Sequence, residues 1–327
     1  MLSAIYEQDF LPCSFGGRPK LSAHHALATL NQAIGGKKVN WVYEADLKNF
    51  FGSLSHEWVL KFVEHRIGDP RIINLIKRWL KAGILDDGEI REPEEGTPQG
   101  GSVSVLLSNI YLHYVLDLWF EKVVKPRMRG ETYLIRYIDD FIVCFQHQSD
   151  ALRFQSALQK RLEKYSLTLE PNKTQLIEFG RFARQHAVAK EGKVKTLYFL
   201  GFTHYCSRTR KGNFMVGRKT EKARFRRSVA KLHSLLREIR HDAVKEQVKK
   251  INRVLQGHYA YYGLGGNAKS LYRLYNTALR YWHKMLGSRS WRSYVTWEKF
   301  LKLRKKYPIA EPKLKLPLTG MKVMARL

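Results

Sequence analysis

Two adjacent aspartates, Asp139 and Asp140, lie between two apolar runs, Tyr133–Ile138 and Phe141–Phe145. β-Branched and aromatic residues on both sides of a short polar pair are typical of a β-hairpin, so we predict a hairpin whose turn is built from the two acidic residues. Burying adjacent carboxylates is costly unless a cation neutralises them, and Mg²⁺ prefers carboxylate oxygens as ligands. The pair therefore predicts a divalent-metal site or, as the simpler alternative, an Asp-rich turn with solvated carboxylates.

A third carboxylate, Asp46, could complete such a site. It ends an apolar run that begins at Trp41 and reads as a strand, ahead of a turn and a helix that begins near Ser55. Carboxylates from two separate strands are the arrangement that two-metal phosphoryl transfer needs, because one ion activates the attacking hydroxyl and the other binds the departing phosphates. We therefore predict that Asp46, Asp139 and Asp140 are the catalytic and metal-binding residues.

A glycine-rich segment, Gly96–Gly101, precedes an apolar helical pattern. Its glycines let the backbone approach a ligand closely, and the N-terminus of the following helix offers N–H groups to it. Such a loop alone does not identify its ligand.

Taken together and in order, these segments resemble the reverse transcriptases encoded by group II introns (intron maturases), over roughly residues 1–310. The Tyr-x-Asp-Asp hairpin at residues 137–140 is similar to their catalytic motif. Residues 96–112, Gly-Thr-Pro-Gln-Gly-Gly-Ser-Val-Ser-Val-Leu-Leu-Ser-Asn-Ile-Tyr-Leu, are similar to the block that shapes their nucleotide and template pocket. Three positions depart from the family pattern: Gly17 replaces an aromatic residue, Val105 a proline and Ile138 an alanine.

The resemblance implies an α+β fold, in which a polymerase palm (an antiparallel sheet with packed helices) is followed by an α-helical thumb or maturase bundle. It implies an RNA-directed DNA polymerase that extends a DNA primer on an RNA template from deoxynucleoside triphosphates. The metal would be a pair of Mg²⁺ ions, with Mn²⁺ as a substitute, held by Asp46, Asp139 and Asp140. Assistance to intron splicing and mobility is implied as well.

The resemblance also assigns a nucleotide pocket to Leu47, Phe51, Gln99 and Lys173. Leu47 would act through its backbone, Gln99 would line the incoming nucleotide, and Lys173 would lie near the leaving pyrophosphate or be an exposed loop lysine. A bulky side chain at Phe51 would exclude a 2′-hydroxyl and so select deoxynucleotides. Phe50 and Phe51 cannot both face the pocket, so one of them belongs to the core.

The positive charge is concentrated in the second half of the chain. Lys and Arg number 58 against 29 acidic residues; residues 1–180 hold 22 of each sign, whereas residues 181–327 hold 36 basic and 7 acidic residues. Tyr and Trp residues interleave these basic residues, and nucleic acid offers both phosphates and stacking faces, so we favour it over a solvated basic face or an acidic membrane surface. Three stripes of apolar residues at helical spacing after Arg218 predict a small helical bundle.

The predicted contacts with nucleic acid come from three segments. Arg18 lies in a Phe15–Pro19 block that is similar to a conserved segment of the family, and Phe199–Tyr205 resembles the hairpin that grips the primer strand. The predicted residues are Arg18, Gly201, Arg224, Arg226, Arg227, Lys249, Lys250 and Arg253.

We predict four parts: a palm with partial fingers (1–206), a connecting hairpin or linker (207–217), a helical thumb (218–300) and a basic, extended tail (301–327). The N-terminal fingers blocks and the C-terminal nuclease domain of some relatives are not found. Three scattered cysteines suggest neither a disulfide framework nor a zinc site. With no signal peptide and no uncharged apolar run that spans a bilayer, we expect a cytoplasmic protein without a membrane partner.

Two alternatives stay open from the sequence. The chain could be an RNA-binding maturase without polymerase activity, or a host-domesticated, group II-like polymerase in DNA repair or phage defence, for which Ile138 is the hint. The oligomeric state is open, with a homodimer as one option.

Overall fold

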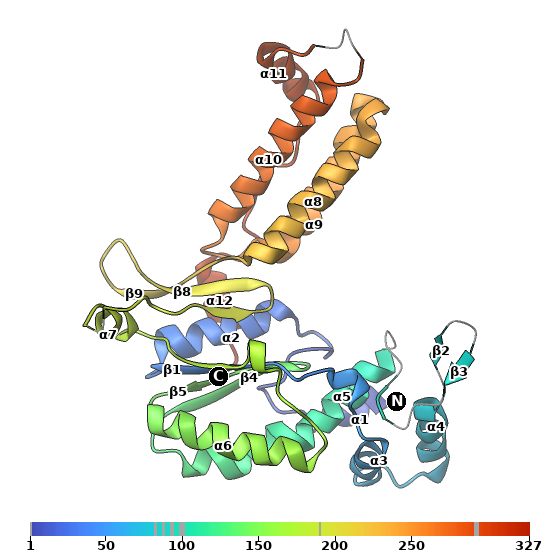
Figure 1. Cartoon of the computed structure of the whole chain (residues 1–327), viewed down its shortest axis with the longest axis vertical. Helices are drawn as coiled ribbons and strands as arrows, with labels where there is room; N and C mark the ends of the chain where they lie inside the picture. The colour runs from blue at the N-terminus through green and yellow to red at the C-terminus, as the bar shows by residue number, and fades with distance from the viewer. Residues whose placement is uncertain are drawn as a thin grey trace. The chain divides into compact units, whose positions relative to one another are not determined.

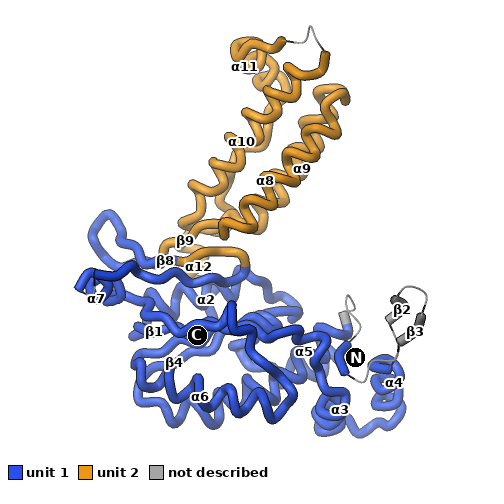
Figure 2. Tube along the Cα trace, viewed as in Figure 1, with its two compact units in different colours: residues 1–200, 205–216, 324–327 blue, residues 201–204, 217–323 orange. Residues whose placement is uncertain are grey.

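The computed structural model describes residues 2–81, 84–86, 89–91, 95–97, 102–189, 191–290 and 294–327, with backbone alone for residues 84–91 and 102. The chain forms two compact units (Figure 2). The first, here called the palm unit, comprises residues 1–200, 205–216 and 324–327, and the second, the helical unit, comprises residues 201–204 and 217–323.

The centre of the palm unit is a four-stranded sheet in the order β4-β5-β1-β6, with every neighbouring pair antiparallel. The apolar runs that predicted strands form its middle, where β5 pairs with both β4 and β1. Figure 1 shows helix α2 on one side of this sheet and α6 on the other. The strands are β1 (Trp41–Ala45), β4 (Thr132–Tyr137), β5 (Asp140–Phe145) and β6 (Gln175–Glu178), and the two helices are α2 (Ala23–Gly36) and α6 (Gln148–Lys164).

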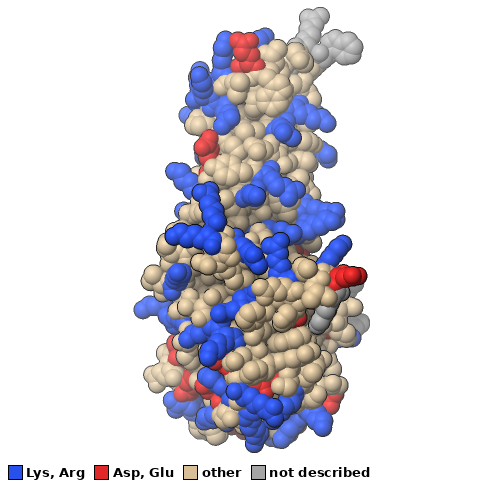
Figure 3. Space-filling view, turned by 90° about the vertical axis from the view of Figure 1, so that its left-hand side faces the viewer, with Lys and Arg blue, Asp and Glu red and all other residues tan. Residues whose placement is uncertain are grey.

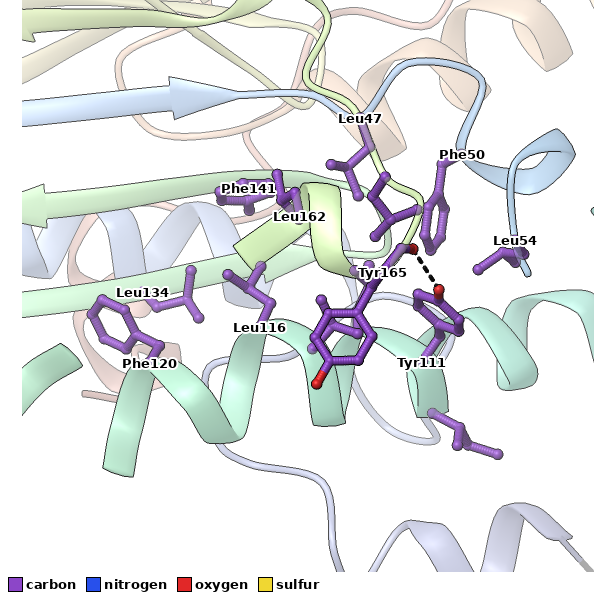
Figure 4. Packing of buried hydrophobic residues seen from close by; sticks show 14 of the residues in the cluster. Leu47, Phe50, Leu54, Tyr111, Leu116, Phe120, Leu134, Phe141, Leu162 and Tyr165 are labelled. Carbon is purple, nitrogen blue, oxygen red and sulfur yellow. Dashed lines mark hydrogen bonds between the residues drawn. The ribbon is translucent and has the colours of Figure 1, made fainter. Parts of the chain in front are cut away.

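Further helices extend the hydrophobic core beyond the sheet. Figure 4 shows Leu47, Phe50 and Tyr111 in this core, where the Tyr111 hydroxyl donates a hydrogen bond of 2.7 Å to the carbonyl oxygen of Tyr165. The elements are α1 (Leu2–Tyr6), the 3₁₀ turn η1 (Phe50–Gly52), α3 (His56–Glu64), α4 (Pro70–Lys81), α5 (Ser102–Leu112), the π-helical turns η2 (His113–Asp117) and η3 (Phe120–Val124), and the 3₁₀ turn η4 (Lys125–Arg127).

One helical stretch, Val103–Arg127, is long and apolar enough to cross a membrane by length and composition alone. Two thirds of its most apolar window is buried inside the protein, and Leu107, Ile110 and Leu116 belong to the palm core. Its apolar side chains therefore pack inside the palm unit.

The remaining elements up to residue 220 are short, and three of them form a second sheet in the order β7-β8-β9, whose strands β8 and β9 contain residues of both units. They are the strand pair β2 (Ile84–Asp86) and β3 (Glu89–Arg91), η5 (Pro171–Lys173), α7 (Ala183–Ala189), β7 (Leu197–Phe199), β8 (Phe202–Arg208) and β9 (Phe214–Thr220).

The helical unit is built on α8, α9 and α10, whose apolar stripes meet in a common core around Leu236, Ile251 and Trp282. The predicted tail is not simply extended, because residues 301–327 contain part of α11 and all of α12; Phe300 on α11 packs against Trp282, with ring centroids 5.2 Å apart. The helices are α8 (Lys222–Glu238), η6 (Ile239–His241), α9 (Val244–Tyr262), α10 (Ala268–Gly287), α11 (Trp297–Lys306) and α12 (Leu318–Met324).

Candidate active site

The β4–β5 hairpin carries the adjacent aspartates, but its turn differs from the prediction. Tyr137 pairs with Asp140, so the two turn residues are Ile138 and Asp139, and Asp140 is the first residue of β5. Ile138 has φ of 61°, a left-handed conformation that is costly for a β-branched residue. A two-residue hairpin turn needs positive φ at its first position, and this requirement overrides the side-chain preference.

The sheet brings Asp46 to the aspartate pair. Ala45 at the end of β1 is paired with Phe141 of β5, so continuing the register by one residue places Asp46 opposite Asp140. Burial raises the pKa of Asp139, and the negative charge of Asp46 raises it further. Burial likewise raises the pKa of Asp140, with further contributions from Asp46, Asp139 and Glu44. The site is thus a cluster of carboxylates that repel one another, an arrangement that favours a bound cation.

One cationic side chain already contacts this cluster. The Lys173 ammonium donates a hydrogen bond to a carboxylate oxygen of Asp46, and this bond raises the pKa of Lys173. Because the lysine side chain is 67% exposed, its ammonium can exchange this partner for another anion at small cost. Lys173 is thus an exposed lysine in a short turn that also contacts the carboxylate cluster.

The donor set fits a hard divalent cation, because it consists of carboxylate oxygens alone. Asp46, Asp139 and Asp140 are the residues that would hold such ions. Across the described part of the chain, however, no three His, Cys, Asp or Glu side chains come close enough together to hold one metal ion. The chemistry of the cluster therefore supports metal binding, while the ligand geometry is not formed.

The two phenylalanines after β1 have different environments. Phe50 is 2% exposed and lies in the palm core, whereas Phe51 is half-buried beside it, with ring centroids 5.6 Å apart. Phe51 is therefore the one that is available to line a nucleotide pocket. The Leu47 side chain is 3% exposed and packs in the core (Figure 4), so only its backbone could contact a triphosphate.

The start of the glycine-rich segment is hydrogen-bonded to the Phe51 turn. The Thr97 N–H donates to the Phe51 carbonyl oxygen at 2.7 Å, and the Gly96 N–H donates to that of Leu54 at 2.8 Å. Gly96 has φ of 91°, and a Cβ there would lie 2.9 Å from the Cα of Gly52. This turn therefore requires glycine. Gln99 lies outside the described residues.

Sequence reasoning missed Arg136, a fully buried arginine on β4. Its five N–H groups each have a partner: two go to the Asp117 carboxylate at 2.8 and 2.6 Å, and the others go to Asn109, Ser14 and the Ile138 carbonyl oxygen. A charged residue within an apolar strand was the available signal, because a buried charge requires a partner. Arg136 holds the turn that presents Asp139.

The Phe15–Pro19 block lies against the same turn. The Phe15 N–H donates to the Arg136 carbonyl oxygen at 2.9 Å, and a Cβ on Gly16 would come within 2.7 Å of the Ile138 backbone nitrogen. Arg18 in this block does not support the prediction of a nucleic-acid contact. Its side chain is 8% exposed, and its guanidinium bonds to the Glu7 carboxylate at 2.6 Å and to the Leu11 carbonyl oxygen at 2.7 Å.

Gly201 has a conformational reason to be glycine. It follows Leu200 in the two-residue turn between β7 and β8, where both residues have positive φ (48° and 76°), as in a type I′ hairpin. A Cβ on Gly201 would lie 3.1 Å from the Tyr262 hydroxyl, so the close neighbour in the structure is a tyrosine.

The predicted basic residues of the helical unit fall into two groups. Arg224, Lys249 and Lys250 lie near acidic side chains of the same unit: Glu221 at 3.8 Å, Glu246 at 3.9 Å and Asp242 at 2.8 Å, respectively. Arg226, Arg227 and Arg253 are exposed.

Arg226 also lines a half-open pocket of about 610 Å³ between α8, α10 and the end of β9. Three more basic residues line it, Lys219, Lys222 and Arg273, and its lining holds no acidic residue. Arg273 lies over the Phe225 ring, 5.0 Å from the centroid. Figure 3 shows Lys and Arg side chains spread over the visible face of the helical unit, with few acidic ones among them. Of the basic lining residues, only Arg226 is among the predicted contacts, whereas Lys219, Lys222 and Arg273 are not.

Comparison with known proteins gives three kinds of similarity. A family model described as "Reverse transcriptase (RNA-dependent DNA polymerase)" matches residues 2–204. Protein YkfC of Escherichia coli is 37% identical over 133 residues, which are 40% of this chain and 35% of that protein. The group II intron-encoded protein LtrA of Lactococcus lactis is 31% identical over 205 residues, which are 59% of this chain and 33% of LtrA.

The chain spans about a third of the length of these two relatives. A structure of apo telomerase from Candida tropicalis matches with a TM-score of 0.52 at 13% identity, over 94% of this chain and 49% of that one, which indicates a common fold. The predicted α+β fold and the predicted likeness to group II intron-encoded proteins are confirmed. Because the family model matches well over half of its residues, this chain belongs to the reverse transcriptase (RNA-dependent DNA polymerase) family.

Proposed function

We propose that this chain is an RNA-directed DNA polymerase of the group II intron type, which extends a DNA primer on an RNA template. The observation that carries the proposal is the convergence of Asp46, Asp139 and Asp140 at one end of the palm sheet, where burial and mutual repulsion raise the pKa of the latter two. Nucleotidyl transfer needs anionic ligands at this place, since its substrates are polyanions that only cations can bring together.

Two Mg²⁺ ions, or Mn²⁺ in their place, would supply an activated primer 3′-hydroxyl and neutralise the triphosphate when bound. The residues of this chain hold and shape the site. Asp46, Asp139 and Asp140 provide the oxygen ligands, and the Leu47 backbone faces the triphosphate. Lys173, now bonded to Asp46, is placed to neutralise the pyrophosphate as it leaves.

Selection of deoxynucleotides is assigned to Phe51. Its ring is half-buried, and its backbone is bonded to Thr97 of the glycine-rich segment, so the side chain cannot move aside freely. A ribose 2′-hydroxyl at this position would meet the ring. Gln99, which lies outside the described residues, would line the incoming nucleotide.

The test is primer extension on oligo(dT)-primed poly(rA) with Mg²⁺. We expect D139A to abolish incorporation while RNA binding is kept, and D69N, at a half-buried aspartate bonded to Arg71, to behave as wild type. Incorporation that survives D139A at the wild-type rate would contradict the assignment. An inactive wild-type chain that still binds RNA tightly would favour the second function below.

A second function, RNA binding without polymerisation as in a maturase, is supported by the basic pocket of the helical unit. Its four cations and the Phe225 ring offer phosphate contacts and a stacking face. We expect R273Q and K222Q each to weaken binding of a labelled single-stranded RNA severalfold. Each should also reduce the slope of log binding constant against log salt concentration by about 1. K302Q is the matched control, because Lys302 lies outside the pocket lining and near Glu298. Equal losses of RNA affinity in the two pocket variants and the control would show that the pocket is not a preferred RNA-binding site.

The biological setting follows from a separate assay. Splicing assistance to an intron that is unaffected by D139A would assign the chain a maturase role. If polymerisation is active and splicing assistance is absent, a host role in DNA repair or phage defence is the better proposal.

A further inference from the structure

Glu44 is a charged residue within the buried middle of the palm sheet. It is 7% exposed and lies on β1 two residues before Asp46, so the two side chains share one face of the sheet. Directly opposite it on β6 is Gln175, whose side-chain amide donates a hydrogen bond of 2.7 Å to Oε2 of Glu44. The carboxylate is therefore held in a defined position next to the catalytic cluster.

The same oxygen, Oε2, also accepts a hydrogen bond of 3.2 Å from the backbone N–H of Tyr198 on β7. Two residues further along, the backbone N–H of Leu200 donates to the carboxylate of Asp140. Tyr198 on β7 and Leu200, the first residue of the turn that follows it, are therefore each bonded to a carboxylate of the palm sheet. One bond ends on a catalytic aspartate and the other on Glu44.

We propose that Glu44 is a positioning residue for the polymerase reaction. By holding Tyr198 it sets where β7 and Leu200 lie relative to Asp140, and thereby where the primer 3′ end meets the reactive phosphate. This inference rests on the proposed polymerase function. Its structural basis, the bond between Glu44 and β7, can be tested without it.

The main rival role for Glu44 is that of an additional metal ligand. Both hydrogen bonds described above end on Oε2, so this oxygen of the carboxylate is engaged by N–H donors. The roles differ in what they require of the side chain. Positioning needs an oxygen that accepts N–H donors, whereas metal binding needs the negative charge.

The first experiment measures hydrogen exchange of the β7 amides in the full chain without substrates. We expect E44A to increase exchange in the segment around Tyr198 and Leu200, and E44Q to keep it close to wild type, because an amide oxygen still accepts both donors. E178Q is the matched control: Glu178 lies at the other end of the same sheet, opposite Trp41, and bonds to His186. Unchanged exchange in a folded E44A protein would overturn the proposed contact.

The second experiment follows single-nucleotide addition to an annealed DNA primer on an RNA template. We expect E44A to lower kcat by about 10- to 100-fold, because the reacting ends are misplaced, while KM for the nucleotide stays within about twofold. E44Q should keep a rate close to that of the wild type, and its half-saturating Mg²⁺ concentration should be unchanged. Loss of activity in E44Q together with a higher Mg²⁺ requirement would overturn positioning in favour of metal binding.

Three further results separate failure of folding, of the positioning role and of the proposed function. Q175A removes one of the two donors without touching β1, so it should show a smaller loss of the same kind if E44A fails to fold. E44A that loses β7 protection but extends primers at the wild-type rate would refute the positioning role. If the wild-type chain itself does not polymerise, the proposed function fails, and hydrogen exchange alone then decides whether Glu44 holds β7.

Discussion

The guanidinium of Arg136 donates a hydrogen bond of 2.9 Å to the carbonyl oxygen of Ile138, the residue whose left-handed backbone turns the chain toward Asp139. The same guanidinium is bonded to Asp117 on the helix that follows the glycine-rich segment. A buried ion pair thus connects the turn that carries Asp139 to a neighbouring helix.

Replacing Arg136 with Met should strongly destabilise the protein. The change leaves Asp117 buried without its partner, and breaking a buried pair in this way costs about 3–5 kcal/mol. Urea unfolding measures the loss. R71M, which breaks the exposed contact with Asp69, should change the unfolding free energy by less than about 1 kcal/mol. The double variant R136M/D117L should lose less unfolding free energy than R136M alone. An equal or larger loss in the double variant would contradict the ion-pair explanation.

Gly96 should not tolerate alanine. A Cβ at this positive φ would meet the backbone of Gly52 and Phe51 at 2.9–3.0 Å, which predicts a loss of about 1–3 kcal/mol in unfolding free energy. Displacement of the Phe51 turn should lower the rate of nucleotide incorporation as well. G68A is the control, since no atom lies within 4 Å of a Cβ there. Similar melting temperatures for G96A and G68A would show that the turn adapts.

Phe50 and Phe51 should differ sharply when each is changed to alanine. F50A empties a buried position of the core and should cost about 3–5 kcal/mol of stability. F51A should fold and should incorporate ribonucleotides more readily relative to deoxynucleotides, by about tenfold or more. Incorporation from matched ribo- and deoxynucleotides measures this ratio. Unchanged discrimination in F51A would remove Phe51 from the nucleotide pocket.

The aspartate cluster should make stability depend on pH in the absence of divalent ions. Because the pKa values of Asp139 and Asp140 are raised in the folded state, that state binds more protons than the unfolded chain at mildly acidic pH. Stability contributed by these groups is therefore present at low pH and is lost as pH rises through their folded pKa values. Thermal unfolding of the wild type and D140N from pH 4 to pH 8 measures the effect.

We expect D140N to be more stable than wild type near neutral pH, with a difference that shrinks as pH falls. D69N should not be stabilised, since its contact with Arg71 lowers the pKa of Asp69. Added Mg²⁺ should stabilise the wild type at neutral pH and D140N less. Equal pH profiles of wild type and D140N would mean that the carboxylates are not coupled.

Several features follow from local sequence and were predicted correctly. The apolar runs around Asp139–Asp140 and before Asp46 form paired strands of one antiparallel sheet, and three stripes after Arg218 form a helical bundle. These patterns are readable because strand and helix periodicity, and the glycines of a tight turn, are properties of neighbouring residues. The order of the segments then points to a polymerase palm without any knowledge of contacts.

The tertiary structure decided the position of the hairpin turn and the burial of charged side chains, because both depend on partners that are distant in sequence. Pairing of Tyr137 with Asp140 moved the hairpin turn to Ile138–Asp139, and the ion pair with Glu7 holds the Arg18 side chain in a largely buried position. Local sequence gives no role to Glu44, because the Tyr198 N–H that donates a hydrogen bond to it lies 154 residues away. Sequence determined which residues carry the chemistry, whereas folding decided which charges are buried, and so which of them must hold the site together.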